Sequence, residues 1–240
     1  MHHLAYDATT LLLGTHVGLY AQSPARQPKR LGTSTFDVMG LAHDGTRWLA
    51  SGHPGDGEDL PSDLGLRQST DGRTWSTVSL LGKVDFHRLA ASGRTVIGVS
   101  AHDGALMRSQ DGGATWSTLT NPGVFDLAID PSAPATVVAT TETGPVRSTD
   151  AGSSWQRLAG APLVARIAWT GRTLYAVAPD GQVHVTTNRG DTWTARGSVG
   201  GQPAALAAEG DTVAVLVADR VLESGDRGAS FRPRLTGISS

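Results

Sequence analysis

A short turn motif that ends in an aromatic residue recurs along the chain. The clearest copy, from Ser109 to Trp116, has the pattern S-x-D-x-G-x-T-W. The copies start at Ser23 (a degenerate one), Ser69, Ser109, Ser148, Thr186 and Ser224. Successive starts are therefore 46, 40, 39, 38 and 38 residues apart. A repeat of this length matches one blade of a β-propeller, because each blade needs four short strands and the turns between them.

The fold predicted from this repeat is an all-β, six-bladed β-propeller with four antiparallel strands in each blade. The motif falls at the turn between the third and fourth strands, and 30 glycines supply many tight turns. The whole chain, 1–240, is predicted to be one propeller domain. Its blades are expected near residues 1–33, 34–82, 83–121, 122–160, 161–199 and 200–240.

The motif resembles the Asp-box, or BNR, repeat of sialidases, sortilin-like receptors and bacterial propellers labelled sialidase-like or glycosyl hydrolase-like. The resemblance extends over the whole chain and implies that the motif residues shape turns instead of catalysing a reaction. Sialidases with this repeat need an arginine triad and a tyrosine–glutamate pair. Here the usual R-I-P segment is missing, and no tyrosine has an obvious glutamate partner. Sialidase activity is therefore not expected, whereas other glycoside hydrolase chemistry stays open.

Composition and charge argue against several kinds of partner. The net charge is -2 and no lysine or arginine cluster stands out, so no nucleic-acid partner is expected. No apolar run approaches the ~20 residues of a membrane helix, so no membrane span is expected. No dinucleotide or phosphate-loop motif occurs, so no nucleotide or flavin cofactor is expected. The protein is predicted to be a monomer. It would be cytoplasmic if Met1 is the native start and extracytoplasmic if a leader was removed.

Five of the eight histidines fall at two aligned positions of the predicted blades. The turn between the second and third strands should share a face with the entry to the first strand, because antiparallel strands reverse direction at every turn. The residues aligned at that turn are His16, His53, His102 and Glu142. The residues of interest at the first-strand entries are His2, Met39 and His87, with Asp37 and Asp85 just upstream. All five histidines belong to the first three blades.

These histidines predict a metal site at the channel mouth of the propeller. Imidazole is the commonest protein ligand for zinc, copper, iron and nickel, and a thioether favours copper. The candidate ligands are His2, His16, Met39, His53, His87 and His102, with copper or zinc as the metal. Asp37 or Asp85 could orient a metal-bound imidazole by a hydrogen bond to its other ring nitrogen, without binding the metal itself. The alternative is that the histidines cap turns, bind water or form a polar rim.

Charged residues at neighbouring strand entries point to a small-ligand site. Arg88 and Arg166 occupy aligned first-strand positions, and Asp126 lies in the blade between them. The two arginines could clamp a carboxylate, or all three residues could form an ion-pair network. The candidate ligand-binding residues are Asp37, Asp85, Arg88, Asp126, Glu142 and Arg166. An insertion at 54–63, next to His53, could be a lid or a solvated loop.

Three functions stay open at this stage. The leading hypothesis is a propeller that binds a metal or another small ligand at its histidine-rich mouth. A glycoside hydrolase-like enzyme and a protein-interaction scaffold are the alternatives. The residues do not distinguish a metal-binding protein from a metal-dependent enzyme, so catalysis is left undecided.

Overall fold

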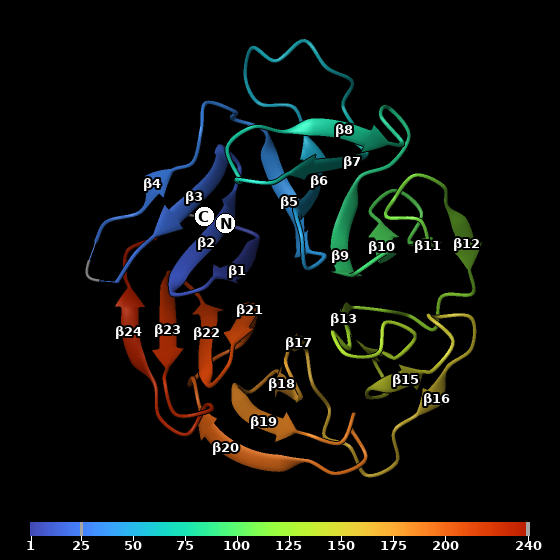
Figure 1. The fold of residues 1–240 in the computed structure, drawn as a ribbon. Helices are drawn as coiled ribbons and strands as arrows, with labels where there is room; N and C mark the ends of the chain where they lie inside the picture. The colour runs from blue at the N-terminus through green and yellow to red at the C-terminus, as the bar shows by residue number, and fades with distance from the viewer. Residues whose placement is uncertain (25, 239–240) are drawn as a thin grey trace. The chain divides into compact units, whose positions relative to one another are not determined.

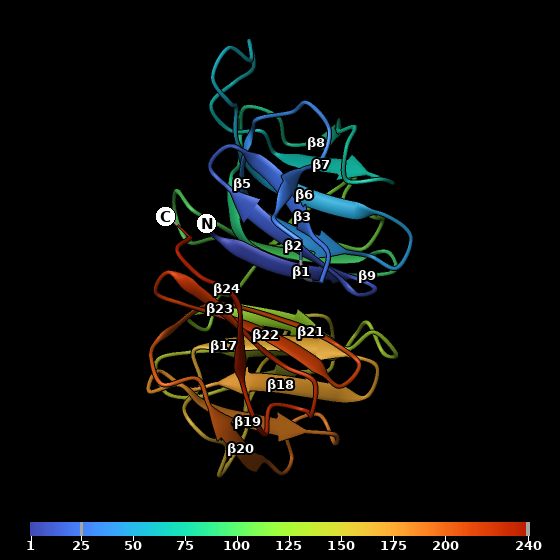
Figure 2. The same ribbon diagram turned by 90° about the vertical axis from the view of Figure 1, so that its left-hand side faces the viewer.

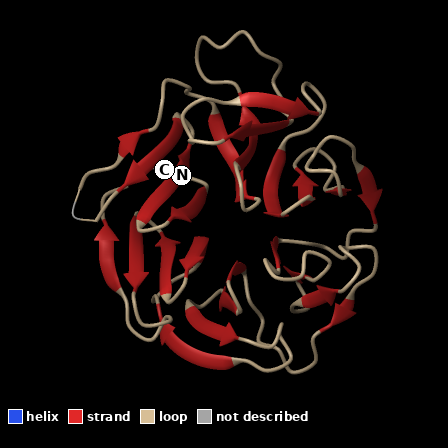
Figure 3. Ribbon diagram, viewed as in Figure 1, coloured by secondary structure: helices blue, strands red, loops and turns tan. Residues whose placement is uncertain are grey.

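The computed structural model describes residues 1–24 and 26–238. Ala25, in the degenerate copy of the repeat, and residues 239–240 of the predicted last blade lie outside the described residues. The described residues form 24 strands and no helix (Figure 3). The strands make six four-stranded antiparallel sheets, each built from contiguous sequence. The protein is thus an all-β, six-bladed β-propeller with four antiparallel strands in each blade.

The chain divides into two compact units, Met1–Asn121 and Pro122–Ser240, and each holds three sheets (Figure 1). The prediction of one domain over 1–240 stays a prediction. The strands of the first unit are β1 (His3–Asp7), β2 (Thr10–Thr15), β3 (Gly18–Gln22), β4 (Lys29–Arg30), β5 (Asp37–His43), β6 (Trp48–His53), β7 (Leu66–Ser69), β8 (Ser76–Ser79), β9 (Phe86–Ser92), β10 (Thr95–Ser100), β11 (Leu106–Ser109) and β12 (Ser117–Leu119).

The second unit repeats the same plan, with four consecutive strands to each sheet. Its strands are β13 (Asp126–Ile129), β14 (Val137–Thr140), β15 (Val146–Ser148), β16 (Gln156–Arg157), β17 (Arg166–Thr170), β18 (Thr173–Val177), β19 (Gln182–Thr186), β20 (Thr194–Ser198), β21 (Pro203–Glu209), β22 (Thr212–Val217), β23 (Arg220–Ser224) and β24 (Arg232–Leu235).

The core of each unit lies between neighbouring sheets. In the first unit, Phe36 joins the cluster that contains Leu12 of the first sheet, and Phe86 packs in a cluster with Leu49 of the second. Both phenylalanines are fully buried, and each such side chain contributes roughly 2–3 kcal/mol. Tyr175 is fully buried in the corresponding cluster of the second unit. Packing of this kind fixes where the polar ends of the strands lie.

The repeated turns between third and fourth strands are held by acidic or amide side chains. In the turn after β15, Ser148 Oγ donates a hydrogen bond of 2.7 Å to Asp150 Oδ1. The Ser154 N–H donates to the same oxygen at 2.8 Å, and the Ser154 hydroxyl donates to Oδ2 at 2.6 Å. These bonds, led by the one from the Ser154 hydroxyl, lower the pKa of Asp150 to about 2. The carboxylate is therefore occupied with shaping its turn.

The insertion between β6 and β7 extends away from the strands of its sheet (Figure 1 and Figure 2). Glu58 anchors it: Ser34 Oγ donates to Glu58 Oε1 at 3.0 Å, and the Gly55 N–H donates to Oε2 at 3.2 Å. The far end of the insertion returns beside the end of β6, where the candidate site begins.

Candidate functional site

The second sheet brings an aspartate and a histidine together at one end of a strand pair. Asp37 begins β5, His53 ends β6, and the two are partners in the antiparallel register. A bulge leaves Met39 outside the ladder. Gly52 has a φ of 152°, and a Cβ at this position would lie 1.7 Å from the carbonyl oxygen of Asp37. Only glycine fits here, so the glycine that precedes His53 is a local requirement of the pairing.

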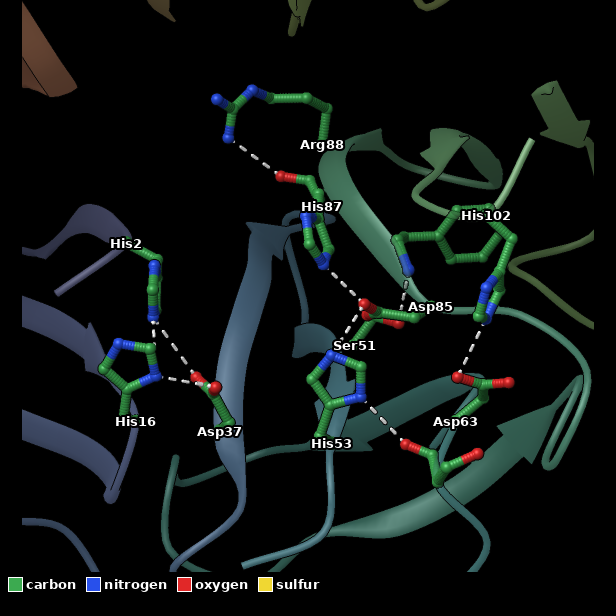
Figure 4. Close-up of polar contacts among 12 residues, drawn as sticks. His2, His16, Asp37, Ser51, His53, Asp63, Asp85, His87, Arg88 and His102 are labelled. Carbon is green, nitrogen blue, oxygen red and sulfur yellow. Dashed lines mark hydrogen bonds and ion pairs between the residues drawn. The ribbon is translucent and has the colours of Figure 1, made fainter. Parts of the chain in front are cut away.

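The first cluster consists of His53, Asp85 and His87, from the second and third sheets (Figure 4). The Asp85 side chain is 1% exposed, whereas the two imidazoles are 42% and 40% exposed. Asp85 Oδ2 lies 3.1 Å from His53 Nε2 and 2.5 Å from His87 Nε2. Neither Asp85 oxygen receives a well-oriented hydrogen bond from any described residue. A buried carboxylate without donors is costly unless a cation compensates it.

The ring of His53 is held in one orientation by the insertion. Its Nδ1 lies 2.9 Å from the carbonyl oxygen of Ser62. A carbonyl oxygen only accepts, so Nδ1 carries the hydrogen, and Nε2 of the neutral ring has a lone pair. That lone pair faces the Asp85 carboxylate, which also only accepts. A proton or a metal ion is needed between two such acceptors.

A buried bond between sheets places Asp85 and His87 beside the end of β6. The Phe86 N–H donates to Ser51 Oγ at 2.9 Å. Gly40 lets β9 approach β5 closely, since a Cβ there would lie 2.4 Å from the carbonyl oxygen of Phe86. The residues on either side of Phe86 are thereby brought to His53, which is two residues beyond Ser51 (Figure 4).

The second cluster consists of His2, His16 and Asp37, from the first and second sheets. His16 Nδ1 lies 2.8 Å from Asp37 Oδ2 and 3.1 Å from His2 Nε2. His2 Nε2 lies 3.4 Å from Asp37 Oδ1, a buried oxygen to which no described residue donates a well-oriented hydrogen bond. Burial lowers the pKa of His2 to about 4, although the Asp37 charge opposes the shift. His2 is therefore neutral near pH 7, the form in which imidazole coordinates metals.

The other two predicted metal ligands belong to neither cluster. His102 Nε2 lies 3.0 Å from Asp63 Oδ1, at the end of the insertion. This hydrogen bond, together with the charge of Asp63, raises the pKa of His102. Met39 is half-buried in the β5 bulge, two residues beyond Asp37, and its role as a ligand stays a prediction.

Two predicted small-ligand residues, Arg88 and Glu142, lie in different units. Arg88 follows His87 on β9, and its guanidinium donates to the carbonyl oxygen of His87 at 3.0 Å (Figure 4). Glu142 is exposed in the turn between β14 and β15. The carboxylate clamp that would use Arg88 and Arg166 stays a prediction.

The charged strand entries of the second unit contact the main chain. Asp126 Oδ2 accepts a hydrogen bond of 3.0 Å from the Ile167 N–H, and Oδ1 accepts one of 3.1 Å from the Leu127 N–H. Arg166 Nε donates to the carbonyl oxygen of Ala204 at 2.8 Å. These contacts tie neighbouring strand entries together within the unit.

The sequence reasoning missed two partners in the insertion, Ser62 and Asp63. The acidic run predicts a lid or a solvated loop, whereas in the structure Ser62 orients His53 and Asp63 contacts His102. A backbone carbonyl leaves no sequence signal. Asp63 could have been singled out, because it is the last acidic residue before the buried Leu64 and is itself 9% exposed.

A polar cavity of about 560 Å³ in the second unit also had no sequence signal. It lies between the fourth and fifth sheets, and its walls include Trp169, Asn188 and Asp191. Burial would raise the pKa of Asp130 in this wall, but bonds from Ser132 and Arg189 outweigh it and lower the pKa. A carboxyl group with a lowered pKa is a poor general acid, so Asp130 is not suited to that role.

Among residues 1–24 and 26–238, no helix is long and apolar enough to cross a membrane.

No family model and no curated protein matches the sequence. Similarity is found to solved structures. The GH74 xyloglucanase from Xanthomonas campestris aligns over 97% of this chain and 45% of its own, with a TM-score of 0.61 and 18% identity.

Two further solved structures share the fold. An ancestral GH74 enzyme aligns over 92% of this chain and 35% of its own, with a TM-score of 0.58 and 20% identity. YCF48 bound to a D1 peptide aligns over 85% of this chain and 70% of its own, with a TM-score of 0.53 and 16% identity. The chain thus spans less than half the length of the two GH74 enzymes. At these identities the likeness shows the fold alone.

Proposed function

We propose that the first unit binds a divalent transition-metal ion, copper or zinc, through His53, Asp85 and His87. The observation that carries the proposal is the buried Asp85 carboxylate, which faces two imidazole nitrogens and receives no well-oriented hydrogen bond from the described residues. The ligand atoms of the three residues all lie within 4.8 Å of one another. A metal ion would satisfy the carboxylate and both ring nitrogens at once.

The chemistry of the three side chains suits zinc and copper. Two imidazoles and one carboxylate are a common donor set, with metal–ligand distances of about 2.0–2.2 Å. The Ser62 carbonyl fixes the ring of His53 from behind, as a backbone carbonyl often does for a metal-bound histidine. The half-exposed imidazoles leave one side of the cluster open. Three protein ligands would leave a coordination position for a small molecule, so a metal-dependent reaction stays an alternative.

Metal analysis of the tag-free protein tests this function. Chelator-treated protein is titrated with Zn²⁺ and with Cu²⁺ by calorimetry, and the metal retained after dialysis is measured. Wild type should retain at least one ion, and His53→Ala with His87→Ala should lose the ion held by this cluster. His43→Ala is the matched control, because His43 is in the same sheet but stacks on Trp48 at 4.7 Å. Absence of stoichiometric binding, or binding unchanged in the double variant, would contradict the proposal.

A second candidate function, carbohydrate binding of the glycoside hydrolase-like kind, is favoured by the GH74 neighbours and the polar cavity of the second unit. Trp169 would stack on a sugar ring, while the Asn188 amide donates and the Asp191 carboxylate accepts hydrogen bonds at the cavity wall. Binding and hydrolysis of xyloglucan oligosaccharides, compared between wild type and Trp169→Ala, test it. A lack of both binding and turnover across a panel of glycans would count against this candidate.

We further infer that the repeated turns belong to the Asp-box class, which the hydrogen bonds around Asp150 support. An interaction scaffold is the remaining alternative, and the likeness to YCF48 in its complex with a D1 peptide keeps it open. A stable peptide or protein partner, retained when the first cluster is substituted, would favour the scaffold.

A further inference from the structure

We propose that the second cluster, His2, His16 and Asp37, binds a metal ion of its own beside the first, so that the first unit holds a pair of ions. The inference rests on the proposed metal-binding function and adds a second ion to it. It is carried by the geometry of the second cluster and by the strand pairing that joins the two clusters.

The ligand atoms of the second cluster lie as close together as ligands around one ion, or slightly closer. Its three separations are 2.8 Å, 3.1 Å and 3.4 Å. Ligands placed tetrahedrally at about 2.0–2.1 Å from zinc lie roughly 3.3–3.4 Å apart. The rings of His2 and His16 meet edge to face, with centroids 4.1 Å apart and planes at 88°. This arrangement directs one nitrogen of each ring towards Asp37.

Hydrogen bonding alone does not satisfy the second cluster. When His2 Nε2 carries the lone pair, a single hydrogen on His16 Nδ1 would have to serve both Asp37 Oδ2 and His2 Nε2. Asp37 Oδ1 is buried, and no described residue donates a well-oriented hydrogen bond to it. A metal ion would replace the shared hydrogen and would also compensate the buried carboxylate.

The two clusters are neighbours because one strand pair contributes to both. Asp37 of the second cluster and His53 of the first are register partners across β5 and β6. Opposite residues in an antiparallel pair have Cα atoms about 4.5–5.5 Å apart. Each ion would have its own carboxylate, Asp37 or Asp85, and two imidazoles. One negative charge for each ion reduces the repulsion between two dications at this spacing.

The first cluster should fill before the second. The carboxylates distinguish the clusters, because Asp85 is 1% exposed and Asp37 is 17% exposed, whereas the imidazoles are 42% and 40% exposed in the first cluster and 22% and 56% in the second. A more exposed carboxylate is less preorganised, and water competes better with it. We therefore expect two binding steps, with the tighter one at the first cluster.

Zinc stoichiometry of the full chain tests the pair. Wild type should bind two ions, His16→Ala and His87→Ala should each bind one, and the combined variant should bind none. His3→Ala is the matched control, because His3 adjoins His2 but its Nδ1 faces the carbonyl oxygen of Leu4 at 3.3 Å. Circular dichroism of each metal-free variant verifies that it is folded.

The outcomes separate this inference from the function on which it rests. One ion in wild type, lost in His87→Ala and kept in His16→Ala, would overturn the second site and leave the proposed function standing. One ion lost in either single variant would indicate one shared site and would also overturn the pair. No ion in wild type would overturn both proposals.

Electron paramagnetic resonance of the copper-loaded protein tests whether the two sites are adjacent. Two Cu²⁺ ions on one strand pair should broaden each other's signals through dipolar coupling, and His16→Ala should restore the spectrum of an isolated ion. Two bound Cu²⁺ ions with uncoupled spectra would contradict the adjacent arrangement.

Discussion

The two units share one blade plan, yet their aspartates at the first-strand entries do different things. In the first unit, Asp37 and Asp85 face imidazole nitrogens supplied by the neighbouring sheets. In the second unit, Asp126 accepts hydrogen bonds from the main chain of Ile167 and of its own neighbour. A carboxylate near a first-strand entry is therefore structural where backbone N–H groups reach it, as at Asp126. It faces possible metal ligands where imidazoles reach it instead, as at Asp37 and Asp85.

The difference lies in which side chains the adjacent blades supply. The residues of the second unit that align with the strand-entry histidines are Phe125, Ala165 and Ala204. None of these can ligate a metal or donate from a ring nitrogen. The site thus combines ligating side chains at aligned positions of adjacent blades with local backbone features such as the β5 bulge and Gly52.

The largest effect is expected from Gly52→Ala, which should disturb the strand pair of the first unit that carries Asp37 and His53. The added methyl group would meet the Asp37 carbonyl oxygen, and alanine also disfavours a φ of 152°. We expect a loss of about 3 kcal/mol in the free energy of unfolding, measured by urea denaturation, together with loss of metal binding. Gly45→Ala is the control, since its φ is 106° but nothing lies within 4 Å of the added Cβ. If both substitutions had equal effects, the effect of Gly52→Ala could not be attributed to the close pairing of β5 with β6.

The next largest effect should come from Asp85→Asn. The amide removes the charge that compensates a dication, so the zinc affinity of the first cluster should fall by about 100-fold or more, measured by calorimetry. The matched substitution in the second unit, Asp126→Asn, should leave zinc affinity unchanged because Asp126 bonds to the main chain. A similar loss in both variants would show that the two aspartates do not differ in the way described.

The fold was predictable because its signal repeats. The pattern from Ser109 to Trp116 returns at nearly constant spacing, and the five clear copies specify turns through local side-chain bonds such as those of Asp150. The division into two compact units had no such signal.

The candidate site was predictable only in part. Aligning the repeats found His2, His16, His53 and His87, because antiparallel reversal fixes which turns share a face. Alignment could not separate them into two clusters, since that depends on the register that pairs Asp37 with His53. Alignment also predicts that the aspartates only orient the histidines. In the structure, each carboxylate lies close enough to two ring nitrogens to be a ligand of the same ion.

A smaller effect should follow from adding metal to wild type. At a free zinc concentration ten times the dissociation constant, binding stabilises the folded state by about 1.4 kcal/mol. Hydrogen exchange should slow by roughly 10-fold in β5, β6 and β9 of the first unit, if exchange there follows unfolding of that unit. The strands of the second unit serve as the internal control. Equal protection of both units would contradict a metal site confined to the first.

The smallest expected effect is that of low pH on the free energy of unfolding, and in this respect the two units should behave alike. The hydrogen bonds to Asp71 in the first unit and to Asp150 in the second hold the pKa of each carboxyl group below its ordinary value. A lowered pKa in the folded state means that the stability these groups give is fully present above pH 4. It is lost as the pH falls through the folded-state pKa, which is about 2 for Asp150. Urea midpoints at pH 5, 3 and 2 should therefore decline in steps shared by both units.

Asp150→Asn would sharpen this test, because the protein already contains an amide at the corresponding place. In the turn after β19, Thr186 Oγ1 donates to Asn188 Oδ1 at 2.8 Å, and the Thr192 N–H donates to the same oxygen at 3.0 Å. The substituted turn should fold in the same way near pH 7, at a cost of about 1 kcal/mol for the weaker, uncharged acceptor. Since an amide does not titrate, the decline in urea midpoint between pH 4 and 2 should become shallower. An unchanged decline would show that the acid sensitivity arises elsewhere in the chain.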